Sequence, residues 1–178
     1  LRNAVFLAIT KFMESENCVR VDTPIFTPTS CEDSTELFTV DYFGTPAYLA
    51  QSGQLYLEAA EHAVGRCYDF SPAFRSEKSK TRRHLTEFWM IDAELPFDDQ
   101  AGNEVFQENM ISFIVKYCLE NYRTELDILE RDISQLEKIQ APFPRITHRE
   151  AIDTLKEKGI EKNYEDDLTG AEENMLSE

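Results

Sequence analysis

Apolar residues near the start of the chain recur every three or four positions, which predicts an amphipathic helix over residues 2–16. Asn17 is expected to end this helix. Two prolines, Pro24 and Pro28, then exclude a central strand, because proline has no N–H for the hydrogen-bond ladder. We therefore expect an edge strand, or a strand at an interface, over residues 23–28.

A hairpin is predicted after the small polar segment 29–36, whose composition is typical of a loop. Residues 38–42 and 47–50 form its two arms, and Gly44 lies in the turn between them.

The next segment predicts a helix, with Ser52 as its N-cap, strong helix formers after it, and Gly65 at its end. Gln51 and Gln54 then lie at a strand-to-helix junction. Side chains at such junctions often point into a site.

Two apolar, β-prone stretches at 67–74 and 88–95 predict a pair of strands joined by a long loop. A long helix is expected over 104–139, because apolar positions recur there at roughly helical spacing. The remainder predicts a short strand at 145–147, a helix from His148 to Lys158 ended by Gly159, and a partly ordered acidic tail over 161–178.

Charge changes this picture at one place. The 178 residues carry a formal net charge of -16, yet residues 75–83 hold five cationic side chains against the single acid Glu77. Such a local reversal of sign indicates an anion-binding segment, although charge alone would favour a solvated surface hairpin with a chance cluster of charges. The overall acidity excludes non-specific nucleic-acid binding by the whole surface.

Cys18, Cys31, Cys67 and Cys118 are widely spaced, with no C-x-x-C pair. This spacing predicts reduced thiols in a cytoplasmic protein rather than a disulfide framework or a zinc site. No stretch approaches the ~20 consecutive apolar residues of a membrane span, so no membrane partner is expected. Because the chain begins at Leu1 without a Met or a secretory signal, we expect it to be a piece of a larger protein.

The central pair of strands carries residues suited to a nucleotide. Arg75 is able to grip a phosphate through two parallel hydrogen bonds, and Glu77 is able to accept from the exocyclic amino group of a base. Phe88 offers a flat face for a purine, and Arg83 and His84 are placed to reach outer phosphates. Core packing of Phe88 and an ordinary surface position for His84 are the alternatives.

The run F-R-S-E-K-S-K-T-R-R-H-L-T-E-F-W-M-I-D-A-E at 74–94 resembles the second signature motif of class II aminoacyl-tRNA synthetases, in the form typical of asparaginyl-tRNA synthetases. The resemblance extends from the first-motif helix and Pro24 through P-F-P-R-I-T at 142–147 and the E-D-D-L-T-G-A-E-E run. It implies an α+β fold in which an antiparallel sheet is flanked by helices. Residues 1–178 would form part of one catalytic domain, with the first two signature motifs present.

The resemblance also implies residue roles. Arg75 would hold the ATP α-phosphate and the substrate carboxylate, Glu77 the adenine amino group, and Phe88 the adenine face. The triphosphate end would lie against Arg83, His84 and Leu85.

For the amino acid, Glu32 would grip the α-amino group from the polar loop. The pocket would be lined by Gln51, Ser52, Gln54 and Leu57, with Gln54 as the main polar contact. The similar aspartyl enzymes carry a Lys, which neutralises the aspartate carboxylate, where this chain has Leu57. Without that cation, the pocket would favour the neutral side-chain amide of asparagine. Asp33 replaces the Gly that usually follows the loop glutamate, which bears on the backbone of that loop.

The implied activity is the ATP-dependent ligation of asparagine to tRNA(Asn) through an asparaginyl-adenylate. ATP and Mg²⁺ would be required, with no metal ligand among residues 1–178, and the metal strand and the third motif would follow Glu178. An anticodon-binding barrel would precede Leu1, and Pro24 would lie in a homodimer interface. The 178-residue chain alone is then expected to be inactive.

Two other functions remain open at this point. One is a tRNA-independent asparagine synthetase that keeps the same fold. The other is a non-catalytic dimerisation or regulatory module, against which the presence of Arg75, Glu77 and Phe88 argues.

Overall fold

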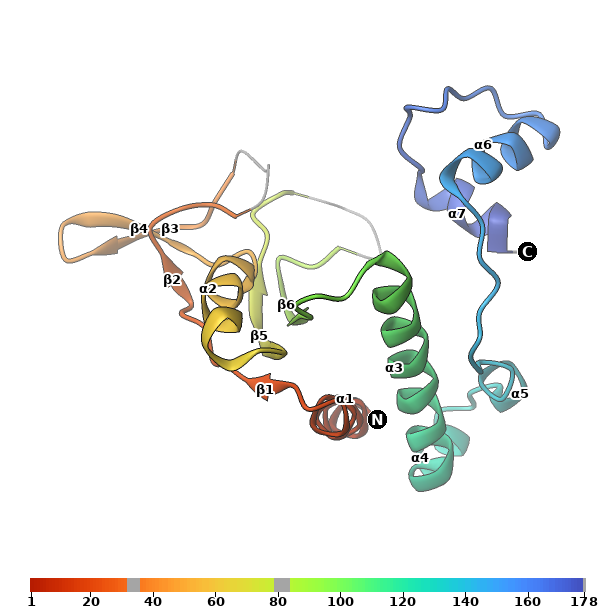
Figure 1. Ribbon diagram of the computed structural model, residues 1–178, viewed down its shortest axis with the longest axis horizontal. Helices are drawn as coiled ribbons and strands as arrows, with labels where there is room; N and C mark the ends of the chain where they lie inside the picture. Colours follow the sequence, from red (N-terminus) through yellow and green to blue (C-terminus); the bar gives the residue numbers. More distant parts are fainter. Residues whose placement is uncertain (32–35, 79–83, 178) are drawn as a thin grey trace. The chain divides into compact units, whose positions relative to one another are not determined.

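The computed structural model describes residues 1–31, 36–78 and 84–177, and the chain divides into two compact units, residues 1–141 and 142–178. Each unit is described by itself. The larger unit holds both sheets and the helices around them (Figure 1).

Helix α1 (Arg2–Ser15) confirms the helix predicted from the first apolar pattern. It buries one stripe of side chains, namely Ala4, Ala8, Ile9, Phe12 and Met13. Asn17 follows it with a φ of 59°, a left-handed conformation that ends helices and that Asn tolerates better than most residues.

The main sheet has the strand order β1-β5-β6. Strands β5 (Cys67–Phe74) and β6 (Glu87–Glu94) are antiparallel, and the short β1 (Val19–Arg20) runs parallel to β5. The two predicted central strands are therefore confirmed to within one residue. The α+β class with a mainly antiparallel sheet is confirmed as well, with one parallel pair added.

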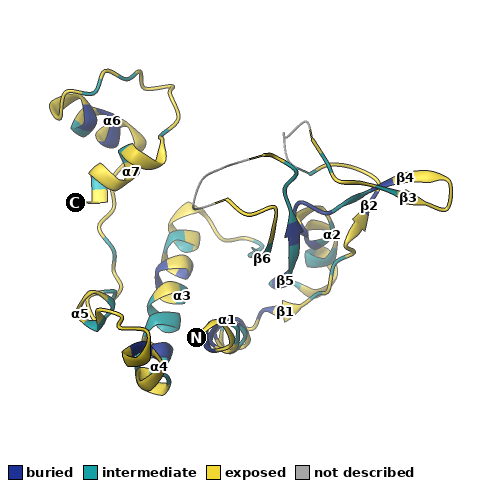
Figure 2. Cartoon of the chain, turned by 180° about the vertical axis from the view of Figure 1, so that it is seen from behind, coloured by how far each residue is buried: buried dark blue, intermediate teal, exposed yellow. Residues whose placement is uncertain are grey.

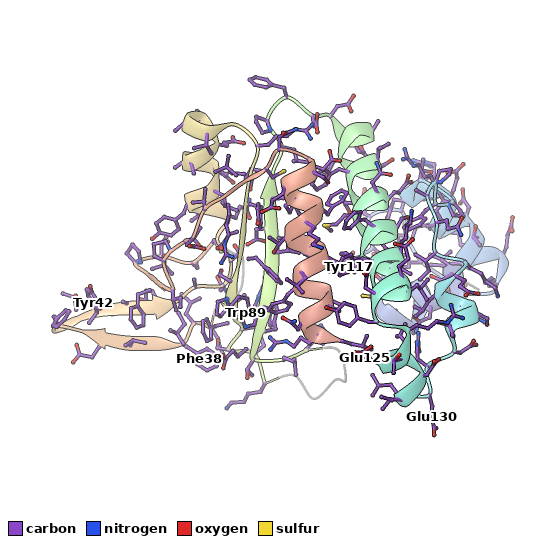
Figure 3. The ribbon with its side chains drawn as sticks, turned by 90° about the horizontal axis from the view of Figure 1, so that it is seen from below. Phe38, Tyr42, Trp89, Tyr117, Glu125 and Glu130 are labelled. Carbon is purple, nitrogen blue, oxygen red and sulfur yellow. The ribbon has the colours of Figure 1, made fainter. Side chains whose placement is uncertain are left out.

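A second sheet has the order β2-β4-β3. Its strands are β2 (Phe26–Thr27), β3 (Thr39–Tyr42) and β4 (Thr45–Leu49). Strand β2 is an edge strand, as the prolines predicted. The β3–β4 turn is tighter than expected, since only Phe43 and Gly44 lie in it, both with positive φ; Figure 3 shows Tyr42 near its tip. The Phe74 amide donates to the Ala50 carbonyl at 2.9 Å and so joins the two sheets.

The core lies on one face of the main sheet, between the sheet, α1 and α3 (Gln100–Asn121). Aromatic rings dominate it: Phe70 lies 4.5 Å from Phe6 and 5.6 Å from Trp89 between ring centroids. Figure 3 shows Trp89 beside α1. The burial colours of Figure 2 mark β5 as the most deeply buried strand.

The opposite face of the sheet packs against α2 (Gln54–Val64). Leu57 is its fully buried residue, and Gly65 follows the helix with a φ of 76°, as predicted. The N-cap is Gly53 rather than the predicted Ser52, although the Ser52 hydroxyl accepts a hydrogen bond from the Gln54 amide at 3.4 Å.

The single long helix predicted over 104–139 is wrong. The structure has three helices there, α3, α4 (Arg123–Ile128) and α5 (Ile133–Leu136). Tyr122 leaves the helical region with a φ of -135°, and Glu130 has a φ of 51°. The Asp132 carboxylate then caps α5 by accepting from the Ser134 amide at 3.0 Å, so local polar contacts outcompete helix continuation.

The smaller unit contains α6 (His148–Glu157) and α7 (Gly170–Ser177). Thr147 and Glu150 form a capping box at the start of α6. The strand predicted at 145–147 is wrong, because Thr147 serves as this N-cap. The tail is more ordered than expected: Lys162 pairs with Glu172 at 2.7 Å, and α7 packs on α6.

Candidate functional site

The register of β5 and β6 sets the geometry of the site. Ala73 lies opposite Phe88, and Phe74 lies opposite Glu87. The Arg75 amide still donates to the Thr86 carbonyl at 3.0 Å, so pairing continues one residue past β5. Arg75 is thereby held at a fixed place directly beyond the end of the strand.

Alternation along the paired strands then sorts the side chains by face. Residues directly opposite each other share a face, so Phe88 lies on the same face as Ala73. Arg75 follows Ala73 by two residues and therefore lies on that face as well. Both Arg75 and Phe88 are half-buried. The structure thus brings together two of the residues predicted to contact ATP, on the face turned away from the aromatic core.

The other residues predicted to contact the nucleotide lie outside the two strands. Glu77 lies three residues beyond β5 and is exposed, so it belongs to the connecting segment. The sequence had instead suggested a position on the strand. His84 and Leu85 are also exposed, Leu85 to 65%. Arg83 and Glu32, predicted for the triphosphate and the α-amino group, lie outside the described residues.

The predicted amino-acid pocket gathers at the start of α2. Gln51 is 2% exposed, Leu57 is completely buried, and Ser52 is half-buried. Gln54 is exposed and donates to the Glu58 carboxylate at 3.0 Å, a contact within its own helix. The sequence had instead predicted Gln54 as the main polar contact of the pocket, a role that stays a prediction.

Cys31 ties the polar loop to this junction. Its Sγ lies 3.0 Å from the Ser52 Oγ, and that same hydroxyl lies 3.4 Å from the Gln54 amide. The residue directly before the predicted Glu32 therefore touches the predicted pocket. This contact was not foreseen from the sequence.

Sequence reasoning also missed a pair of carboxylates. Asp69 and Asp92 are directly opposite each other in the β5–β6 ladder, on the same face as Phe88. The Asp92 carboxylate accepts from the Gly53 amide at 3.0 Å, and the Asp69 carboxylate accepts from the hydroxyls of Thr23 and Ser71. The sequence shows one aspartate in each strand, but only the register of the two strands reveals them as a cross-strand pair.

Asp69, Asp92 and Glu94 place three carboxyl groups on this face of the strand pair. Burial raises the pKa of Glu94, and the carboxylates of Glu61, Glu58 and Asp92 raise it further.

Within 1–31, 36–78 and 84–177, no three or more His, Cys, Asp or Glu side chains gather in a way that would hold a metal ion. Across the same part of the chain, none of the helices combines the length and apolar character that crossing a membrane requires.

Comparison with known proteins gives one consistent result. A family model described as "tRNA synthetases class II (D, K and N)" matches residues 1–175. The asparagine–tRNA ligases of Desulforamulus reducens and Pelotomaculum thermopropionicum are each 49% identical, over 178 and 167 residues. These alignments cover 100% and 94% of this chain but only 42% and 39% of the relatives, so the chain spans about two fifths of their length.

A solved structure agrees. Asparaginyl-tRNA synthetase from Pyrococcus horikoshii, complexed with asparaginyl-adenylate, superposes with a TM-score of 0.93 at 36% identity. The match covers 98% of this chain and 40% of that one.

Proposed function

Because the chain belongs to the family of class II tRNA synthetases (D, K and N), we propose that its protein ligates asparagine to tRNA(Asn) through an asparaginyl-adenylate. The observation that carries the proposal is the β5–β6 register. Phe88 lies opposite Ala73, and Arg75 follows Ala73 by two residues, so all three share one face of the strand pair. Helix α2 covers that face.

In the first step, a carboxylate oxygen of asparagine attacks the α-phosphorus of ATP. A new P–O bond forms, the bond to the β-phosphate oxygen breaks, and pyrophosphate leaves. No general base is needed, because the nucleophile is already ionised. The ribose hydroxyl at the end of the tRNA then attacks the mixed anhydride and releases AMP.

Arg75 contributes to the first step by position and charge. Its guanidinium donates to both the α-phosphate and the attacking carboxylate, which holds two anions together and offsets their repulsion. Phe88 stacks on the adenine, and Glu77 accepts from the adenine amino group. Arg83, His84 and Leu85 approach the triphosphate end. Mg²⁺ bound to the triphosphate would supply further charge neutralisation, and the described residues offer it no cluster of ligands.

The preference for asparagine rests on Leu57. This side chain is a hydrocarbon, without charge or hydrogen-bond donor, and it is completely buried, so it can neither compensate a second carboxylate nor hydrogen-bond to one. An aspartate would bury a poorly compensated charge, whereas the asparagine amide is neutral. Gln51, Ser52 and Gln54 supply the polar wall, and Glu32 holds the α-amino group.

We further propose a cytoplasmic homodimer. Four free cysteines favour a reducing compartment. Pro24 is exposed and precedes Ile25 and Phe26, which are 43% and 47% exposed, so an apolar segment of an edge strand remains to be covered. Sedimentation that gave only a monomer at micromolar concentrations would contradict this proposal.

The test is ATP–pyrophosphate exchange with the full-length protein. We expect exchange that depends on asparagine, at least 100-fold weaker exchange with aspartate, and charging of tRNA(Asn). Exchange without charging would favour a tRNA-independent synthetase, and no exchange with any amino acid would favour a non-catalytic module. The 178-residue chain alone stays predicted to be inactive.

A further inference from the structure

Asp69 is an unusual residue for the middle of a buried strand. It is 1% exposed, and its cross-strand neighbour is another carboxylate, Asp92. Like charges directly opposite each other destabilise a sheet, and a buried carboxylate carries a desolvation cost. Selection for stability alone would favour an apolar or hydroxyl side chain there, so the position indicates a functional demand.

The contacts of Asp69 reach two other segments. Its Oδ2 accepts hydrogen bonds from the Thr23 hydroxyl and from the Ser71 hydroxyl, the latter at 2.8 Å. Thr23 directly precedes Pro24, which belongs to the first-motif segment. Asp69 therefore links the main sheet to the chain entering the second sheet.

Gly53 rests directly on this cluster. A Cβ added to Gly53 would lie 2.5 Å from Asp69 Oδ2 and 2.8 Å from Thr23 Oγ1, closer than real Cβ contacts come. The Gly53 amide also donates to Asp92. The N-cap of α2 is therefore held between two carboxylates, and only glycine allows so close an approach.

We propose that Asp69 is a positioning residue of the amino-acid pocket. It seats Gly53, and through Gly53 it fixes the neighbouring Ser52 and Gln54, which are predicted to contact asparagine. This inference rests on the proposed function. Asp69 acts through geometry, because its Oδ2 accepts from the Thr23 and Ser71 hydroxyls beside the start of α2 and the residue, at 1% exposure, offers almost no surface to a substrate.

The test compares two substitutions of Asp69 in the full-length protein. Asp69→Ala removes the acceptor, and we expect the KM for asparagine to rise about tenfold while the KM for ATP stays within about twofold. Asp69→Asn keeps an acceptor of the same shape, and its KM for asparagine should stay within about threefold of the wild type. Equal losses in both variants would assign the effect to charge and overturn the positioning role.

Thr23→Val provides a second route if Asp69→Ala does not fold. It keeps the shape of the side chain and deletes the donor to Asp69, and we expect about a threefold rise in the KM for asparagine. Ile9→Val, a buried substitution in α1 on the other side of the sheet, is the control for general destabilisation. Its two KM values should not change, and a rise in Thr23→Val no larger than in this control would overturn the proposal.

A double-mutant cycle examines the link to Gly53. Gly53→Ala should raise the KM for asparagine about tenfold or more, and adding Asp69→Ala should then cost much less than it does alone, because the two residues act on one contact. Strictly additive effects would contradict the proposal. If wild-type protein shows no asparagine-dependent exchange, the proposed function fails instead, so the two failures are distinguishable.

Discussion

The sixteen residues of β5 and β6 alternate between two faces, one apolar and one polar. Tyr68, Phe70, Ile91 and Ala93 alternate onto the face that packs against α1 and α3. The intervening positions include Asp69, Ser71, Phe88, Asp92 and Glu94, on the face beside α2. One face removes apolar area from water, and the other holds carboxylates at a cost to stability.

This contrast indicates a division of labour within one pair of strands. Burial of aromatic rings on one face supplies the free energy that fixes the register. The register in turn fixes which polar side chains meet on the other face. Substitutions on the two faces should therefore separate into losses of stability and losses of activity.

The largest expected effect is on the polar side. Arg75→Ala should lower asparagine-dependent exchange by at least about 1,000-fold, or about 4 kcal/mol of transition-state stabilisation. The thermal midpoint should stay within about 2 °C of the wild type, because Arg75 lies outside the apolar core. A near-normal rate would remove the central assignment of the site.

The matching loss on the core face is Phe70→Ala. Phe70 is 6% exposed and contacts two aromatic rings, so its truncation should cost about 3 kcal/mol of unfolding free energy, measured by urea denaturation. The KM values of the folded fraction should be unchanged. A rise in KM without loss of stability would contradict the division between the faces.

Phe88 and Trp89 are adjacent aromatic residues on opposite faces and form a matched pair. Phe88→Ala should raise the KM for ATP about tenfold through lost stacking. Trp89→Ala should leave the KM for ATP unchanged and lower the thermal midpoint, since its ring lies 5.3 Å from Phe6. A rise in the KM for ATP in Trp89→Ala, together with a loss of stability alone in Phe88→Ala, would mean that the β5–β6 register is wrong.

The smallest effect concerns pH. The pKa of Glu94 is raised in the folded protein, so its contribution to stability is fully present below its ordinary pKa and is lost as the pH rises through the raised value. Glu94→Gln should therefore raise the thermal midpoint by a few degrees at about pH 8 and have no effect near about pH 4. A gain that is equal at both pH values would exclude titration of Glu94 as the cause.

The sequence predicts local structure well where side-chain pattern alone decides it. The apolar runs of β5 and β6 fix these strands to within one residue, and Gly65 and Gly159 mark the ends of α2 and α6. The long helix fails at Tyr122 and Glu130, because backbone angles there depend on local capping that periodicity does not contain.

For the site, the residue types in the 74–94 run point to a nucleotide, but the cluster of Asp69, Thr23 and Gly53 could not be predicted. It depends on the pairing register and on a close approach between three distant segments. A hairpin register follows from a short turn, and the loop between β5 and β6 is too long to impose one.

The contact between Cys31 and Ser52 has a practical consequence. Burial raises the pKa values of Cys18, Cys67 and Cys118, which keeps these thiols protonated and slow to react, whereas Cys31 is partly exposed. A thiol-specific reagent should therefore label Cys31 first. The Cys31 Sγ lies 3.0 Å from the Oγ of the predicted pocket residue Ser52, so the labelling rate of this thiol should report occupancy of the pocket without any engineered probe.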